Sequence, residues 1–110
     1  MKFGLEEDVI RKICFVFVGF SEIDKVVLYG SRAKGKYKAG SDIDLCLFGK
    51  NIDLAFLYRL DQVLDDLLLP YSFDLSIYSH LSNPEIIDHI DRVGVVFYSK
   101  NDFERPKEPL

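Results

Sequence analysis

Residues 30–45 read Gly-Ser-Arg-Ala-Lys-Gly-Lys-Tyr-Lys-Ala-Gly-Ser-Asp-Ile-Asp-Leu and join two segments that have the pattern of β-strands. The run before them, 25–29, is apolar and β-branched and stops at a glycine, which is typical of a strand that enters a tight turn. From Asp42 to Phe48 the side chains alternate between two faces. The connection is too short for a parallel crossover, so we expect an antiparallel pair in a mixed sheet.

Gly30 and Ser31 are placed to hold phosphate groups at the end of the first strand. Glycine lets backbone N–H groups approach a triphosphate, and the Ser31 hydroxyl adds a donor at the start of a short helical turn. Arg32 follows directly, and its planar guanidinium can pair two phosphate oxygens. We therefore predict a phosphate-binding turn here, although a Gly-Ser pair after a strand also occurs in ordinary turns.

Asp42 and Asp44 are the predicted metal ligands. Two residues along a strand place their Cα atoms roughly 6.5 Å apart on one face, near enough for both carboxylates to reach Mg²⁺ ions spaced roughly 4 Å apart in a two-metal site. A third oxygen ligand is expected, and Asp74 is the candidate because it lies in a second alternating strand, 73–78. Mg²⁺ prefers a few carboxylates together with substrate phosphates. An Asp-x-Asp pair alone also fits a solvated strand edge.

The remaining pattern predicts helices alternating with strands. We expect a helix over 5–20, a second helix from an Asp53 N-cap to Pro70, a third from Asn83-Pro84 to Asp91, and a last strand over 95–98. The predicted fold class is therefore α+β, a mixed sheet with helices packed on one face. The face that carries the aspartates would then remain open to substrate.

Together these residues resemble the minimal nucleotidyltransferases, the smallest members of the DNA polymerase β-like nucleotidyltransferase superfamily. The resemblance spans roughly Val26 to Tyr98 and rests on Gly-Ser, the Arg-Ala-x-Gly continuation, Ser-Asp-x-Asp at its fixed spacing and the later aspartate. It implies a polymerase β-like palm. It also implies one set of nucleotide-binding residues, Gly30, Ser31, Arg32 and Ser41, and one set of catalytic and metal-binding residues, Asp42, Asp44 and Asp74.

Length and charge favour one small catalytic module. The 110 residues, 48% of them hydrophobic, predict a single domain over 1–100, followed by a charged tail over 101–110 that contains Pro106 and Pro109. The net charge is −4, yet five basic residues and no acidic ones fall within 25–41. A basic loop on an acidic body is suited to steering a triphosphate, whereas the acidic remainder argues against direct nucleic-acid binding. Some of the loop lysines fit a merely solvated surface equally well.

Two cysteines, Cys14 and Cys46, lie in apolar segments without metal-binding spacing. We expect reduced core residues and a cytoplasmic protein. No segment has the pattern of a signal peptide or membrane span, so no membrane association is expected. His80 follows the Asp74 strand and is treated as a surface residue, and His89, between acidic neighbours, is expected to face solvent.

The function implied is a Mg²⁺-dependent transfer of a nucleoside monophosphate, AMP from ATP, onto an acceptor hydroxyl. The resemblance implies that the acceptor is a tyrosine of a HEPN-domain ribonuclease toxin, with this chain as its antitoxin. The chain leaves little room for a second substrate-binding domain, which also indicates that a partner supplies the acceptor surface. Two alternatives stay open: a binding module that neutralises its partner by contact alone, and a small-molecule adenylyltransferase of the antibiotic-modifying kind.

Overall fold

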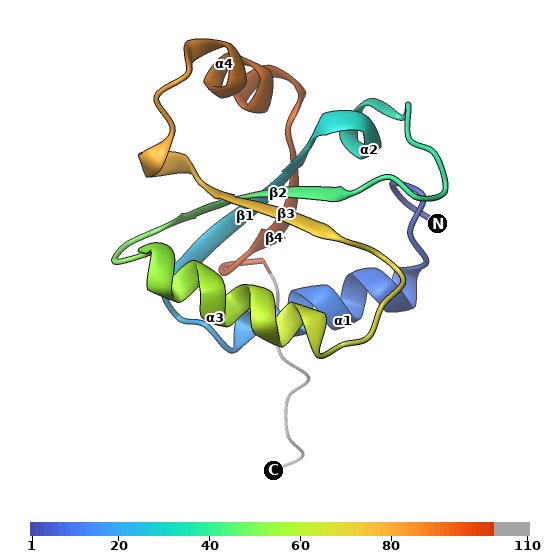
Figure 1. The fold of residues 1–110 in the computed structure, drawn as a ribbon, viewed down its shortest axis with the longest axis horizontal. Helices are drawn as coiled ribbons and strands as arrows, with labels where there is room; N and C mark the ends of the chain where they lie inside the picture. Colours follow the sequence, from blue (N-terminus) through green and yellow to red (C-terminus); the bar gives the residue numbers. More distant parts are fainter. Residues whose placement is uncertain (103–110) are drawn as a thin grey trace.

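The computed structural model describes residues 1–102 as one sheet with helices on both sides (Figure 1). The elements in chain order are α1 (Glu7–Val18), β1 (Ile23–Tyr29), α2 (Gly30–Lys34), β2 (Ile43–Gly49), α3 (Leu54–Asp65), β3 (Phe73–Ile77), the 3₁₀ turn η1 (Tyr78–His80), α4 (Pro84–Val93) and β4 (Val95–Ser99). The predicted tail over 101–110 lies outside the described residues from 103 onward. No helix within residues 1–102 is both long and apolar enough to cross a membrane.

The sheet has the strand order β3-β2-β1-β4 and mixes both pairing directions. β1 pairs antiparallel with β2 and with β4, whereas β2 and β3 run parallel. The antiparallel β1–β2 pair confirms the expectation drawn from the short connection, and the mixed α+β class is confirmed with it. The pairing brings the end of β1 and the beginnings of β2 and β3 together at one end of the strands.

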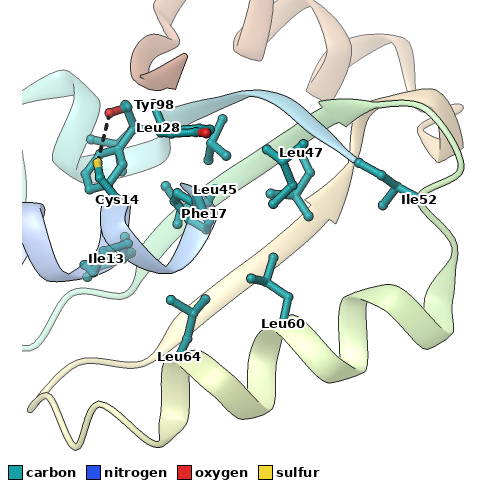
Figure 2. Close-up of a cluster of buried hydrophobic side chains, with 14 of the residues drawn as sticks. Ile13, Cys14, Phe17, Leu28, Leu45, Leu47, Ile52, Leu60, Leu64 and Tyr98 are labelled. Atoms are coloured by element: carbon teal, nitrogen blue, oxygen red, sulfur yellow. Dashed lines mark hydrogen bonds between the residues drawn. The ribbon is translucent and has the colours of Figure 1, made fainter. Parts of the chain in front are cut away.

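α1 and α3 cover one face of the sheet, and the main core lies between them and the strands. Figure 2 shows buried side chains from both helices meeting those of β1 and β2: Ile13, Phe17, Leu28, Leu45, Leu47, Leu60 and Leu64. Each such side chain contributes about 1.5–3 kcal/mol on burial. Both cysteines are buried and free, as expected, and the Cys14 thiol donates a hydrogen bond to the Phe97 carbonyl at 3.5 Å.

The opposite face is not left entirely open, which differs from the prediction of helices on one face only. α4 lies across it and packs Ile90 against Val27 and Cys46 in a second buried cluster (Figure 1). α4 is strongly amphipathic, and its apolar stripe has to be covered by some part of the sheet.

Local signals set the starts of α3 and α4 where the sequence places them. The Asp53 side chain accepts a hydrogen bond from the Phe56 amide at 2.8 Å, and Asn83 accepts one from Glu85 at 2.9 Å, so both predicted N-caps are present. α3 ends at Asp65, well before Pro70. The chain turns at Leu68, whose φ of 55° is incompatible with continuing the helix.

Candidate active site

The turn between β1 and α2 requires glycine at position 30. Gly30 has a φ of 74°, a left-handed conformation that costs other residues energy. A Cβ atom built on Gly30 would collide with the carboxylate of Asp44. The turn and the aspartate are therefore in direct van der Waals contact, an approach that no other amino acid permits at position 30. Ser31 follows as the second residue of α2 and is half-buried.

The pairing of β2 with β3 brings the predicted acidic residues together. Asp44 and Asp74 are register partners in the parallel ladder, so their side chains leave the same face of the sheet. Asp42 lies just before β2, two residues from Asp44, and by the same alternation faces the same way. Asp42 and Asp74 are exposed, whereas Asp44 is half-buried. The three carboxylates thus lie together at one end of strands β2 and β3, next to the Gly30 turn.

The electrostatic environment of Asp44 is unfavourable for its negative charge. Burial raises the pKa of Asp44 above its ordinary value, and the carboxylates of Asp74 and Asp42 raise it further. His89 and Arg32 act in the opposite direction but less strongly. A carboxylate that lies beside two others concentrates negative potential at this edge, which a bound cation would neutralise.

The three carboxylates are chemically suited to Mg²⁺. Mg²⁺ is commonly held by one or two carboxylates, with substrate phosphates and water completing the shell. Asp42, Asp44 and Asp74 together offer carboxylate oxygens of this kind. Within residues 1–102, no three His, Cys, Asp or Glu side chains are gathered into a preformed metal centre.

Tyr29 extends from β1 across the same face. It is the register partner of Asp44, and its hydroxyl shares a hydrogen bond of 3.3 Å with Ser76 on β3. Burial is the main reason that the pKa of Tyr29 is raised. The Tyr29 hydroxyl therefore stays protonated and uncharged at physiological pH, close to the carboxylates of Asp74 and Asp44.

Arg32, the predicted phosphate contact, is buried on α2, directly after β1. Its side chain is only 2% exposed, and its guanidinium donates to the Ser41 carbonyl at 2.8 and 3.1 Å and to the Phe3 carbonyl at 2.8 Å. The rings of Tyr37 and Tyr71 flank it, with centroids 5.5 and 5.1 Å from the guanidinium carbon. These bonds use three of its five N–H donors, so Arg32 connects the loop to the N-terminal segment, and its predicted phosphate contact stays a prediction.

Ser41 takes part in the same loop structure. Its carbonyl accepts both hydrogen bonds from the Arg32 guanidinium described above, and its hydroxyl accepts a hydrogen bond from the Lys38 amide at 2.8 Å. The predicted nucleotide contact of Ser41 stays a prediction. Lys34, Lys36 and Lys38 are exposed around it, so their ammonium groups are available to a triphosphate in solution.

His89 contradicts the expectation that it faces solvent. It is half-buried on α4, and its Nε2 accepts a hydrogen bond of 3.2 Å from the backbone amide of Gly30. Its ring meets Tyr29 edge-on, with centroids 6.1 Å apart. The signal in the sequence was helical spacing: position 89 is three residues from Ile86 and adjoins Ile90, which places it beside the apolar stripe.

A glycine turn next to paired strand aspartates defines a nucleotidyltransferase palm, and sequence comparison agrees. The family model described as "Polymerase beta, Nucleotidyltransferase" matches residues 11–103. The chain therefore belongs to the polymerase beta nucleotidyltransferase family, and the predicted enzyme class is confirmed. No curated protein matches the chain significantly.

Solved structures share this fold at low sequence identity. A chain of a toxin–antitoxin crystal structure with AMP-PNP superimposes with a TM-score of 0.68 at 22% identity, covering 86% of this chain and 74% of that one. A structure of a tri-AMPylated Shewanella oneidensis HEPN toxin in complex with MNT antitoxin gives 0.65 at 17%, with coverage of 88% and 75%. A nucleotidyltransferase described as putative, from Sulfolobus solfataricus, gives 0.51 at 18%, with coverage of 86% and 81%. At these identities the likeness concerns the fold.

Proposed function

We propose that this chain transfers AMP from ATP to a hydroxyl group of a HEPN-domain protein and thereby acts as its antitoxin. The proposal rests on one observation: the Gly30 turn contacts Asp44, and Asp44 pairs with Asp74 on the neighbouring strand. Transfer of a nucleotidyl group needs both phosphate-binding and acidic groups, and the turn proposed to bind phosphate adjoins the carboxylates. The similar folds in a HEPN–MNT complex and in a toxin–antitoxin structure with AMP-PNP support this choice of nucleotide and partner.

The residues divide the work by position. Ser31 would bind the β- and γ-phosphates through its backbone N–H and its hydroxyl. Gly30, whose own N–H is donated to His89, would let the phosphates come close to the turn because it has no side chain. Asp44 and Asp42 would hold Mg²⁺ with the triphosphate, and Asp74 would complete the ligand set on the acceptor side. When bound, the metal supplies charge neutralisation for the transferring phosphoryl group and the leaving pyrophosphate.

Asp74 is positioned to receive the acceptor. It lies on β3, an edge strand of the sheet, and its side chain is exposed, whereas Asp44 lies one strand further in. An acceptor hydroxyl that approaches from the β3 side of the sheet would meet Asp74 before Asp44. The hydroxyl oxygen would form a bond to the α-phosphorus as the bond to the pyrophosphate oxygen breaks, and Asp74 would take the hydroxyl proton.

The proposal extends to the compartment. Two free, buried thiols without disulfide partners support a cytoplasmic protein, since disulfides are rare there. Burial raises the pKa of Cys14 to about 11, so its thiolate form is scarce at neutral pH. We regard Cys14 as a core residue and assign it no part in the transfer.

The test is the mass of the partner. The chain is co-expressed with a candidate HEPN-domain protein, the complex is incubated with ATP and Mg²⁺, and intact-mass spectrometry counts AMP additions. We expect one or more AMP units on the partner, none with Asp74→Asn, and an unchanged number with Asp61→Asn, an exposed aspartate of α3. A stable complex without any mass shift would favour neutralisation by contact alone. Absence of a complex, with transfer of AMP to a small molecule, would favour a small-molecule adenylyltransferase.

A further inference from the structure

His89 connects α4 to the turn that begins the active site. The Gly30 amide donates to His89 Nε2 at 3.2 Å, although the two residues are 59 positions apart in the sequence. An imidazole nitrogen accepts a hydrogen bond only when it carries no proton, so the neutral ring has its proton on Nδ1 in this arrangement. The contact joins a side chain to a backbone group and is therefore sensitive to the identity of residue 89 alone.

The two residues that follow His89 fix the part of α4 that carries the imidazole. The next residue, Ile90, is buried against Val27 and Cys46 beneath α4. The residue after it, Asp91, accepts a hydrogen bond from the Tyr78 hydroxyl at 3.0 Å. α4 is thus fixed to the sheet at the positions that follow His89. A side chain on a fixed helix is a better support for a turn than one on a loop.

The hydrogen bond acts on the residue that adjoins Asp44. Gly30 is in a left-handed conformation, and glycine has many alternatives to it. With its amide bonded to His89, the peptide unit before Gly30 has one orientation, and the Gly30 Cα rests against the Asp44 carboxylate. The contacts therefore run without a gap from α4 through His89 and Gly30 to the aspartate.

We propose that His89 is a positioning residue that keeps the Gly30 turn in its nucleotide-binding conformation. The proposal rests on the proposed function, because it concerns the turn that would hold the triphosphate. His89 acts through Gly30 and takes no proton from the substrate. Loss of the imidazole frees the turn to leave this conformation, so each nucleotide has to reorder it on binding. That cost falls equally on ground state and transition state, and it raises KM without lowering kcat.

The first measurement needs no nucleotide. Amide hydrogen exchange at Gly30 is compared by NMR in the wild-type chain, His89→Ala and His89→Gln, because a glutamine oxygen is also a hydrogen-bond acceptor. We expect His89→Ala to speed exchange at Gly30 by roughly fivefold to tenfold, the effect of losing one ordinary hydrogen bond, and His89→Gln to restore much of the protection. The control is His80→Ala, which removes an exposed histidine from the end of η1. Unchanged exchange in His89→Ala would overturn the proposal.

The second measurement uses the complex with its acceptor. For His89→Ala we expect the KM for ATP to rise by roughly fivefold to tenfold with kcat within about twofold of wild type, and partial recovery in His89→Gln. An active wild type whose KM is unmoved by His89→Ala overturns the role of His89 and leaves the proposed function standing. A wild type that neither binds an ATP analogue nor transfers AMP overturns both. A loss of kcat alone would assign His89 to the chemical step and contradict positioning.

Discussion

Asp44 and Asp74 are register partners across the parallel β2–β3 pair, yet the first is half-buried and the second exposed. The difference follows from strand order, because β2 lies inside the sheet and β3 at its edge. The inner carboxylate touches the Gly30 turn, and the outer one faces the approach from solvent. The pair therefore has a nucleotide side and an acceptor side, and substitutions on the two sides should fail differently.

Asp44→Asn should abolish transfer while leaving the fold intact. Asparagine has nearly the same shape but no charge, so it fits beside Gly30 and binds Mg²⁺ poorly. Since losing a group that merely orients a metal ligand costs roughly 10–100-fold, losing a ligand itself should cost at least roughly 100-fold in kcat/KM. AMP incorporation into the partner checks the activity, and circular dichroism checks the fold. Activity near wild type in a folded variant would contradict the site assignment.

The same substitution should stabilise the metal-free chain at neutral pH. The pKa of Asp44 is raised in the folded state above its ordinary value of 3.8, so folding takes up a proton between those two pKa values. Stability conferred by the protonated form is therefore present at low pH and lost as the pH rises through this window. In EDTA, Asp44→Asn should unfold at higher temperature than wild type at pH 7, with the difference shrinking toward pH 4.

Mg²⁺ and a control variant complete this pH test. Added Mg²⁺ should raise the unfolding temperature of the wild type and leave Asp44→Asn nearly unmoved, because the cation neutralises the repulsion that the variant has already removed. Asp61→Asn, on the exposed surface of α3, should unfold at the wild-type temperature in EDTA and respond to Mg²⁺ as the wild type does. A wild type that is more stable than Asp44→Asn in EDTA at pH 7 would show that burial and neighbouring charges do not disfavour this carboxylate.

Two glycines with the same backbone angle separate strain from contact. Gly30 and Gly35 both have a φ of 74°, but a Cβ on Gly35 would meet open space. Gly35→Ala should therefore cost only the left-handed conformation, roughly 1–2 kcal/mol of unfolding free energy, and retain nucleotide affinity. Gly30→Ala should cost more and weaken nucleotide binding, because its methyl group displaces Asp44.

Urea unfolding and calorimetric titration with a non-hydrolysable ATP analogue in Mg²⁺ would measure both quantities. Gly30→Val should lower the affinity further, and Lys36→Ala, which removes an exposed loop lysine, should change it little. Equal losses of affinity in Gly30→Ala and Gly35→Ala would mean that the contact with Asp44 has no part in binding.

The placement of the acidic residues could be predicted because strand periodicity is a local rule. Alternation along 42–48 and 73–78 put the aspartates on one face, and the short connection required β1 and β2 to be antiparallel. Helix caps at Asp53 and Asn83 are equally local, since each side chain bonds an amide two or three residues away. Rules of this range need no knowledge of the tertiary structure.

The positions of Arg32 and His89 could not be predicted in the same way. Arg32 adjoins Ser31 in the chain, but the α2 turn sends its side chain to the Phe3 carbonyl, 29 positions away. His89 reaches Gly30 only because α4 docks on the face that was expected to be open. Helical spacing can place His89 beside the apolar stripe of α4. Neither spacing nor composition, however, tells which part of the molecule that stripe or the Arg32 side chain will contact.

Arg32→Ala should destabilise the chain rather than selectively weaken nucleotide binding. The buried guanidinium makes three hydrogen bonds to two carbonyls, and its removal leaves the Ser41 and Phe3 carbonyls without that donor. We expect a loss of roughly 2–4 kcal/mol of unfolding free energy in urea titrations. Arg32→Lys should recover little, because an ammonium group cannot reproduce the planar fork. Lys34→Ala, two residues on and exposed, should cost under roughly 0.5 kcal/mol. If Arg32→Ala kept wild-type stability but lost affinity for the ATP analogue, the guanidinium would have to leave these carbonyls to contact the phosphates.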